Sequence, residues 1–166
     1  MDEAAITELL AKQAITETLI KYCRAMDRMD DELGRSVFHA DATADYGAMY
    51  QGTGHGFIEF VHGAHAGMLL HQHQLGNILI AIEGERAASE SYVMVTFRTR
   101  DAAGQLVGMV GCGRYIDRWE KRAGRWAISH RHYLHLLDEA RPVAEGQFPS
   151  TGTRDRTDQS YALPLG

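Results

Sequence analysis

The feature that most constrains the fold is a succession of four long strand-like segments in the second half of the chain. They begin at residues 69, 86, 105 and 125 and read LLHQHQLGNILIAIEG, RAASESYVMVTFRTRD, QLVGMVGCGRYIDRWEKR and RWAISHRHYLHLLDE. The breaks between them, EGER, DAAGQ and KRAGR, have the length and chemistry of hairpin turns. Four strands joined in this way form an antiparallel meander. We therefore expect a sheet with an apolar inner face.

The first half of the chain is predicted to supply helices. Apolar residues recur at helical spacing from Ile6 to Met26, which predicts one long helix ending near Asp27. A short second helix is expected through DELGRSVFHA, with Asp30 and Asp31 as capping residues. Two short strands, DATADYG and AMYQG, and a third helix through GHGFIEFVHGAHAGML follow. Helices before an antiparallel sheet predict an α+β fold, a cone-shaped barrel in which a curved sheet wraps the first helix and leaves a ligand cavity.

Length and charge limit the classes of partner. The 166 residues predict one domain over residues 1–140, followed by a Gly- and Pro-rich tail over 141–166. We expect that tail to be an extended arm packed on a neighbouring subunit through Phe148, Tyr161 and Leu163. The net charge of -5 disfavours a nucleic-acid partner and a polybasic membrane anchor.

Targeting and redox signals are sparse. The acidic amphipathic start does not resemble a secretory signal, and no apolar run approaches the ~20 residues of a membrane span. Cys23 and Cys112 imply neither a disulfide framework nor a zinc pattern. The expected location is a reducing, bacterial-type cytoplasm.

The stretch HQHQLGN opens the first long strand with two histidines. Period-two alternation over 69–82 puts His71, His73 and Asn77 on one face, so Asn77 is a further pocket candidate. The apolar far end of this strand is predicted to be buried on both faces. Two readings of the histidines stay open: they satisfy one another or water, or one of them is a general base.

Asp27 favours the second reading for His73. It lies at the end of a helix whose apolar stripe must pack against the sheet. A carboxylate that accepts from one imidazole nitrogen fixes the tautomer and leaves the other nitrogen as a base near neutral pH.

A metal site is the competing reading. His71 with His73, and His130 with His132, have the spacing of paired ligands on a strand. If Arg131 points into the cavity, His130 and His132 point out of it, so the two pairs cannot share a site. We therefore predict no metal and no other cofactor. The remaining histidines, which are expected to be solvated or interfacial, are His39, His55, His62, His65 and His135.

The motifs YCRAMDRMD, VFHADATADYG, HQHQLGN and GRYIDRWEKRAGRWAISHR occur in an order that resembles the SnoaL-like branch of the NTF2-like superfamily. The resemblance covers about residues 5–137. This group includes scytalone dehydratase, hexachlorocyclohexane dehydrochlorinase, diarylpropane lyases, isomerases and non-catalytic subunits of dioxygenases. It implies an NTF2-like cone and homo-oligomers, with a trimer favoured and a dimer as the second choice.

The resemblance also implies catalytic positions. The aspartate of the family's His–Asp pair matches Asp27, and its histidine, in an H-x-x-G stretch, matches His73. A pocket tyrosine matches Tyr46, and an arginine five residues after the last-strand tryptophan matches Arg131. These two residues are predicted to stabilise negative charge on oxygen.

The sequence departs from the family where a leaving group would be handled. Tyr22 stands where the dehydrochlorinase has lysine, and Gly113 and Tyr115 stand where the dehydratase has serine and asparagine. The expected function is therefore a cofactor-independent lyase acting on a different small, apolar substrate, aromatic compounds included. The alternatives are an isomerase or cyclase on the same pair and a non-catalytic binding protein. The predicted substrate-binding residues are Tyr22, Tyr50, Asn77, Met109 and Tyr115.

Overall fold

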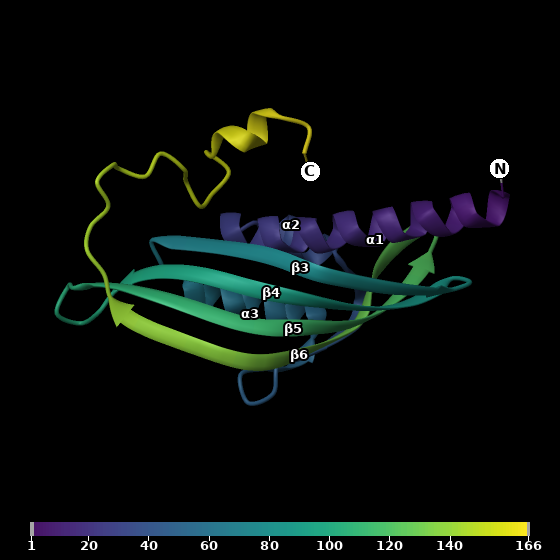
Figure 1. Ribbon diagram of the computed structural model, residues 1–166, viewed down its shortest axis with the longest axis horizontal. Coiled ribbons are helices and arrows are strands. Elements are labelled where there is room, and N and C mark those ends of the chain that lie inside the picture. Colours follow the sequence, from purple (N-terminus) through teal and green to yellow (C-terminus); the bar gives the residue numbers. More distant parts are fainter. Residues whose placement is uncertain (1, 166) are drawn as a thin grey trace.

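The computed structural model describes residues 2–165 and places three helices before and beside one sheet (Figure 1). The helices are α1 (Glu3–Arg28), α2 (Asp31–Ser36) and α3 (Gly54–His65). The strands are β1 (Phe38–Asp45), β2 (Gln51–Thr53), β3 (Leu70–Glu83), β4 (Arg86–Arg100), β5 (Leu106–Arg122) and β6 (Arg125–Pro142). A short 3-10 helix, η1 (Gln159–Ala162), lies in the tail.

Helix α1 begins and ends as its sequence predicts. The Asp2 carboxylate accepts from the Ala4 N–H at the start, and Met29 adopts a left-handed conformation at the end. The predicted end near Asp27 is thus confirmed to within one residue. Its buried stripe packs against β3 and the interior of the sheet, and consists of Ile15, Leu19, Tyr22, Cys23, Ala25 and Met26.

The second helix is shorter than predicted. Asp30 caps α2 by accepting from the Leu33 N–H, as expected, but the helix stops at Ser36. The expectation that it continues through Ala40 is wrong. Val37 and Phe38 are buried, and the Val37 carbonyl accepts from the Ile128 N–H of β6, so this stretch is drawn into the sheet.

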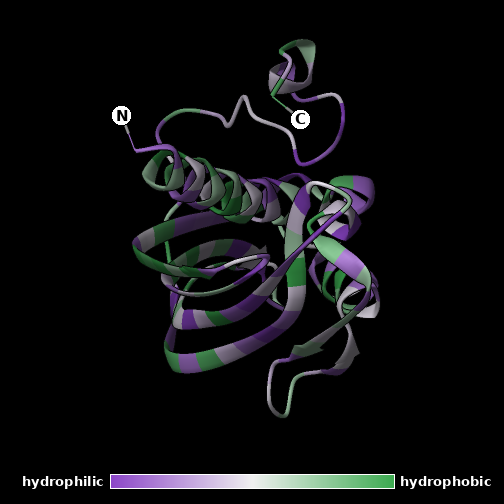
Figure 2. Cartoon of the chain, turned by 90° about the vertical axis from the view of Figure 1, so that its right-hand side faces the viewer, coloured by the Kyte–Doolittle hydropathy of each residue, from purple (hydrophilic) through white to green (hydrophobic). Residues whose placement is uncertain are grey.

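The sheet has the order β2-β1-β6-β5-β4-β3 and contains the predicted meander. All neighbours are antiparallel except β1 and β6, which run parallel. The sheet curves strongly around the interior, and α1 lies along the open side beside the edge strand β3 (Figure 2). The α+β cone is confirmed, but the sheet does not close into a barrel, because β2 and β3 remain its two edges.

A bulge in β3 changes which face points inward. The pairing with β4 shifts between Gly76 and Leu79, and Asn77 adopts a left-handed backbone with φ 48°. Before the bulge the odd-numbered side chains face inward, and beyond it the even-numbered Ile78, Ile80 and Ile82 do. The prediction that this end is buried on both faces is wrong, since Leu79 is 71% exposed.

The tail returns to its own chain. The Tyr161 hydroxyl donates to Asp30, and Arg156 pairs with Asp30 and Glu32 near the end of α1. Phe148 is 79% and Leu163 59% exposed, and the contact of the tail with a neighbouring subunit stays a prediction. The homo-oligomer itself stays a prediction. Among residues 2–165, no helix is long and apolar enough to span a membrane.

Candidate functional site

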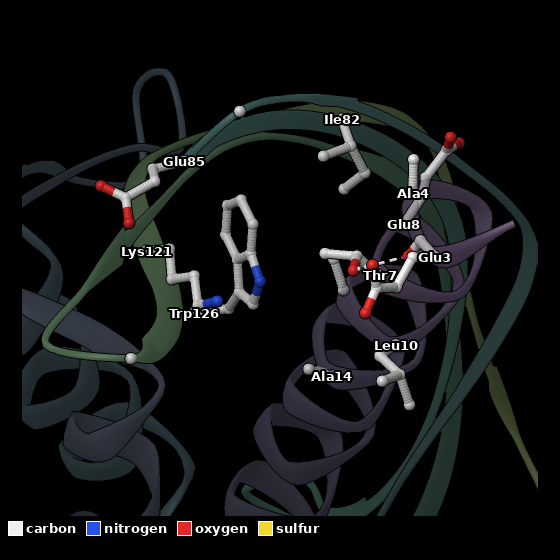
Figure 3. A pocket seen from close by; sticks show the side chains of 13 residues that line it. Glu3, Ala4, Thr7, Glu8, Leu10, Ala14, Ile82, Glu85, Lys121 and Trp126 are labelled. Carbon is white, nitrogen blue, oxygen red and sulfur yellow. Dashed lines mark hydrogen bonds between the residues drawn. The ribbon is translucent and has the colours of Figure 1, made fainter.

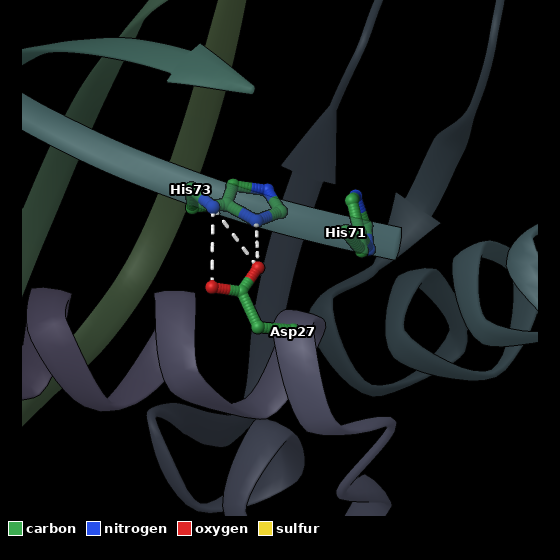
Figure 4. Close-up of side chains that lie close together, drawn as sticks. All are labelled: Asp27, His71 and His73. Atoms are coloured by element: carbon green, nitrogen blue, oxygen red, sulfur yellow. Dashed lines mark hydrogen bonds and ion pairs between the residues drawn. The ribbon is translucent and has the colours of Figure 1, made fainter. Parts of the chain in front are cut away.

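The last turn of α1 and the first residues of β3 form an acid–base pair (Figure 4). The Nδ1 atom of His73 lies 2.7 Å from Oδ1 of Asp27, and the His73 backbone N–H donates to both carboxylate oxygens at 3.0 and 3.1 Å. Both side chains are largely buried. Since a carboxylate only accepts, Nδ1 carries the hydrogen and Nε2 of a neutral ring keeps its lone pair. No described residue bonds to that Nε2 atom.

Two further imidazoles adjoin His73. His71 lies on the same strand with its ring centroid 4.7 Å from that of His73, and His65 of α3 lies 4.6 Å from His71. Burial, followed by the neighbouring His73, lowers the pKa of His71 to about 2 and that of His65 to about 4. Both rings are therefore neutral at physiological pH.

These histidines share a pocket of about 110 Å³. Most of its wall is aromatic or aliphatic, and Met49, which is 54% exposed, forms part of its rim. Apolar pockets with few polar groups are typical sites for small ligands. The lining residues are Tyr22, Met26, Tyr46, Met49, Phe57, Val61, His65, His71, His73, Val95, Phe97, Tyr115 and Tyr133.

A pair of tyrosines supplies hydroxyl groups to this wall. The hydroxyls of Tyr22 and Tyr46 lie 3.0 Å apart, and either can be the donor. Burial, opposed in part by the charge of Arg131, raises the pKa of both well above the usual range, so both stay protonated. In such a pair one O–H donates to the other, and the second hydrogen remains free for a ligand.

Arg131 is fully buried behind this wall. Its Nε and Nη2 atoms each lie 2.7 Å from an oxygen of Asp117, and its guanidinium lies 4.2 Å from the Tyr22 ring centre and 4.0 Å from that of Tyr115. Burial opposes the charge, but Asp117 outweighs it and the pKa of Arg131 is raised. Arg131 is not among the lining residues. The structure thus supports a role in holding the tyrosines rather than direct contact with a ligand.

The predicted substrate-binding residues divide into two groups. Tyr22 and Tyr115 line the pocket. Tyr50 instead donates to the Thr53 carbonyl and packs against Phe57, and Met109 lies outside the lining. Asn77 is exposed on the outer face. The prediction that it shares the His73 face is wrong, because the bulge reverses the alternation at that residue.

Sequence reasoning missed several wall residues. His65 was expected to be solvated or interfacial, but the packing of α3 brings it to the pocket together with Val61. Phe97 comes from β4 and stacks on His71 with ring centroids 4.6 Å apart. The strand alternation that points Val95 inward could have identified Phe97. Two other histidines that were expected to be solvated or interfacial are buried: His39 bonds to the Glu120 carbonyl and His62 to Asp31.

Three of the candidate metal ligands lie close together. One ligand atom each from Asp27, His71 and His73 lies within 4.8 Å of the others, so the three could surround a cation. In this arrangement, however, Asp27 already accepts from His73, and His71 Nδ1 lies 3.2 Å from the Met26 carbonyl oxygen. His130 and His132 contact Thr43 and Asp45 elsewhere. The two histidine pairs do not meet.

A larger cleft of about 890 Å³ lies toward the N-terminal end of α1 (Figure 3). Trp126 and Lys121 face Ile82 and the first turns of α1 across it. Its polar groups are the carboxylates Glu3, Glu8 and Glu85, the Lys121 ammonium, the Thr7 hydroxyl and the Trp126 indole N–H. None of its lining residues is a histidine, tyrosine or cysteine. Size alone therefore does not identify the site, and the smaller pocket is the one that His65, His71 and His73 line.

Comparison with known proteins places the chain in a broad group. Residues 7–132 match the model of the SnoaL-like domain, whereas no curated protein matches the sequence. Three similar solved structures are a candidate scytalone dehydratase from Novosphingobium aromaticivorans, a type 2 hexachlorocyclohexane dehydrochlorinase (LinA) and an NTF2-like superfamily protein from Salmonella enterica serovar Typhimurium.

The likeness to these structures extends over most of each chain. The TM-scores are 0.72, 0.74 and 0.67, at 20%, 14% and 24% identity. The alignments cover 86%, 89% and 84% of this chain and 99%, 99% and 96% of the respective structures. At these identities the likeness demonstrates a shared fold.

Proposed function

The chain belongs to the SnoaL-like domain family, and on that premise we propose that it is a cofactor-independent lyase that removes a proton from carbon. The observation that carries the proposal is the Asp27–His73 pair, in which the second ring nitrogen of His73 is unpaired at an aromatic pocket. An oriented imidazole with one bare nitrogen is the arrangement that general-base catalysis needs.

The proposed step is an elimination. Nε2 of His73 takes the proton of a C–H bond, and the released electron pair forms a double bond to the adjacent carbon. The leaving group on that carbon departs with its own bonding pair, either as halide or as hydroxide, which takes a proton from the His73 imidazolium and leaves as water. Asp27 stabilises the resulting imidazolium, and its two bonds from the His73 backbone N–H hold the carboxylate in place.

The tyrosine pair is proposed to assist the departing or developing anion. Since one hydrogen of Tyr22 and Tyr46 is not used between them, it can donate to an oxygen or halogen of the substrate. The buried Arg131 adds positive potential behind the rings of Tyr22 and Tyr115 without reaching the pocket. Its proposed role is to position these tyrosines.

The substrate class follows from the wall of the pocket. A volume of about 110 Å³ suits a molecule of roughly one aromatic ring, and Phe57 and Phe97 offer flat apolar surfaces. A dehydratase and a dehydrochlorinase are among the proteins that share the fold, and both names describe eliminations. We propose a small, apolar, single-ring substrate.

Deuterium exchange tests the base before the natural substrate is known. Wild-type protein is incubated in D₂O with a panel of single-ring β-hydroxy and β-halo ketones, and exchange at carbon and release of water or halide are followed by NMR. His73→Ala should lower exchange by about 10²- to 10⁴-fold and leave the protein folded. Only elimination releases the leaving group, so the same panel separates it from isomerisation.

A matched control uses the surface pair His132 and Asp45, whose atoms lie 3.4 Å apart. His132→Ala removes a comparable imidazole and should leave exchange unchanged. Retained exchange in His73→Ala would sink the proposal. Stoichiometric zinc or iron in the purified active protein would overturn the cofactor-independent mechanism.

A further inference from the structure

His71 is a buried imidazole that the proposed proton transfer does not use. It is 3% exposed, stacks on Phe97 and lines the pocket beside His73. In Figure 4 the two rings stand next to each other on β3, and each has a nitrogen on the side away from Asp27. A histidine in this position adds a second polar side chain to the pocket wall beside His73.

The hydrogen bond of His71 determines what this atom can do. Nδ1 lies 3.2 Å from the Met26 carbonyl oxygen, which can only accept, so Nδ1 carries the hydrogen. The neutral ring then has a lone pair on Nε2. That atom is buried and has no partner within residues 2–165. An unpaired buried acceptor costs free energy, and a donor that enters the pocket removes this cost.

None of the described neighbours of His71 donates a hydrogen bond to its Nε2 atom, so the donor has to come from a ligand. Burial and the adjacent imidazoles of His73 and His65 keep the ring neutral, so it remains an acceptor at physiological pH. His73 Nδ1 is engaged by Asp27, and a neutral His73 offers only a lone pair at Nε2. Two acceptors therefore stand side by side, their ring centroids 4.7 Å apart.

We propose that Nε2 of His71 accepts a hydrogen bond from an O–H or N–H group of the substrate, on an atom close to the carbon whose proton His73 removes. His71 is then a specificity-determining residue. It favours hydroxylated or amino-substituted single-ring compounds over aprotic ones of the same size. This inference rests on the proposed function for the identity of the reacting carbon, but the binding contact does not require turnover.

Binding of phenol and fluorobenzene to the full chain tests the contact. The two probes are similar in size, and only phenol has a donor. His71→Phe keeps a ring against Phe97 and removes both nitrogens. We expect it to weaken phenol by about fivefold, the value of one net hydrogen bond, and to change fluorobenzene less than twofold. The quantity compared between variants is the ratio of the phenol to the fluorobenzene dissociation constant. The different hydration of the two probes is the same for every variant and cancels in that comparison.

Two variants separate the acceptor on His71 from the acceptor on His73 and from a loss of ring shape. His73→Phe removes the rival acceptor and should leave the phenol ratio unchanged. His71→Gln keeps an acceptor near the Nε2 position and should restore part of the ratio lost in His71→Phe. An unchanged ratio in His71→Phe, or its loss in His73→Phe alone, overturns the proposal.

The tautomer gives an independent readout. Long-range ¹H–¹⁵N spectra of the free protein should place the His71 hydrogen on Nδ1, and phenol should shift the Nε2 signal. A hydrogen on Nε2 contradicts the inference. A protein that binds phenol in this way but exchanges no carbon-bound hydrogen would refute the proposed function alone.

Discussion

Two buried acid–base pairs in this molecule show how similar groups serve different purposes. Asp117 and Arg131 form two bonds of 2.7 Å with no exposed surface, so both carboxylate oxygens are used. Asp27 and His73 form one ring bond of 2.7 Å, and the other ring nitrogen is unpaired at a pocket. Arginine keeps its proton in proteins, whereas imidazole exchanges its proton near neutral pH. The first pair is suited to structure and the second to proton transfer.

The largest expected effect breaks the second pair. Asp27→Asn keeps the size of the side chain but removes the charge that orients and stabilises the His73 imidazolium. We expect deuterium exchange at carbon to fall by roughly 10²- to 10⁴-fold, with a much smaller change in the free energy of unfolding. Exchange is followed by NMR and stability by urea denaturation. Normal exchange in Asp27→Asn would remove the distinction between the pairs.

The first pair should respond in the opposite way. Asp117→Asn leaves the Arg131 charge buried without its counter-ion, and we expect the free energy of unfolding to fall by about 3–5 kcal/mol. Urea denaturation measures the loss. The double variant Asp117→Leu, Arg131→Met removes both charges and should recover most of it. A change below about 1 kcal/mol in Asp117→Asn would mean that the pair is not buried in solution.

Acid should destabilise the region around His73 but not the Arg131 pair, because His71 and His65 gain protons on unfolding, whereas arginine is protonated in both states. The folded His71 pKa of about 2 lies below the ordinary value of 6.5. Between pH 6.5 and 4 the unfolded chain therefore binds a proton that the folded chain does not. Stability is lost as the pH falls through this window, by up to about 1.4 kcal/mol per pH unit for one such group. His65, with a pKa of about 4, acts in the same direction.

Urea denaturation between pH 7 and 4 measures this dependence. His71→Phe should reduce the slope, because one protonation difference is removed. The titratable and charged groups that face His71 are His73, His65, Arg154 and Asp27, and the variant leaves them in place. Equal slopes in wild type and variant would show that His71 is accessible to protons in the folded protein.

The parts of the site that could be predicted depend on local patterns. Hairpin-sized breaks gave the four long strands, and helical spacing gave the end of α1 within one residue. Asp27 and His73 meet because a helix with an apolar stripe must pack beside the first strand of that sheet, whose period-two alternation turns His73 toward it. Neither inference requires knowledge of the strand register.

The parts that could not be predicted depend on register. Arg122 pairs with Arg125 and Trp119 with Ile128, so unbroken counting would place Asp117 opposite His130. A bulge between Arg118 and Trp119 shifts the pairing by one residue and places Asp117 opposite Arg131. Arg131 was therefore assigned to the pocket from the family resemblance, because its pairing with Asp117 could not be derived from the sequence. One inserted residue decides such contacts.

The smallest expected effect concerns the bulge at Asn77, which belongs to the strand of the His73 pair and not to that of the Arg131 pair. Its φ of 48° suits Asn or Gly but strains a β-branched residue. Asn77→Gly should leave the free energy of unfolding nearly unchanged, whereas Asn77→Val should lower it by about 1–2 kcal/mol. Urea denaturation compares the stability of the two variants.

The bulge can move along β3 to relieve the strain in Asn77→Val. The side chains between its old and new positions then change faces of the sheet, and deuterium exchange falls if His73 is one of them. Equal stability of both variants would mean that Asn77 is not left-handed in solution, and the inward face of β3 beyond Gly76 would then have to be reassigned.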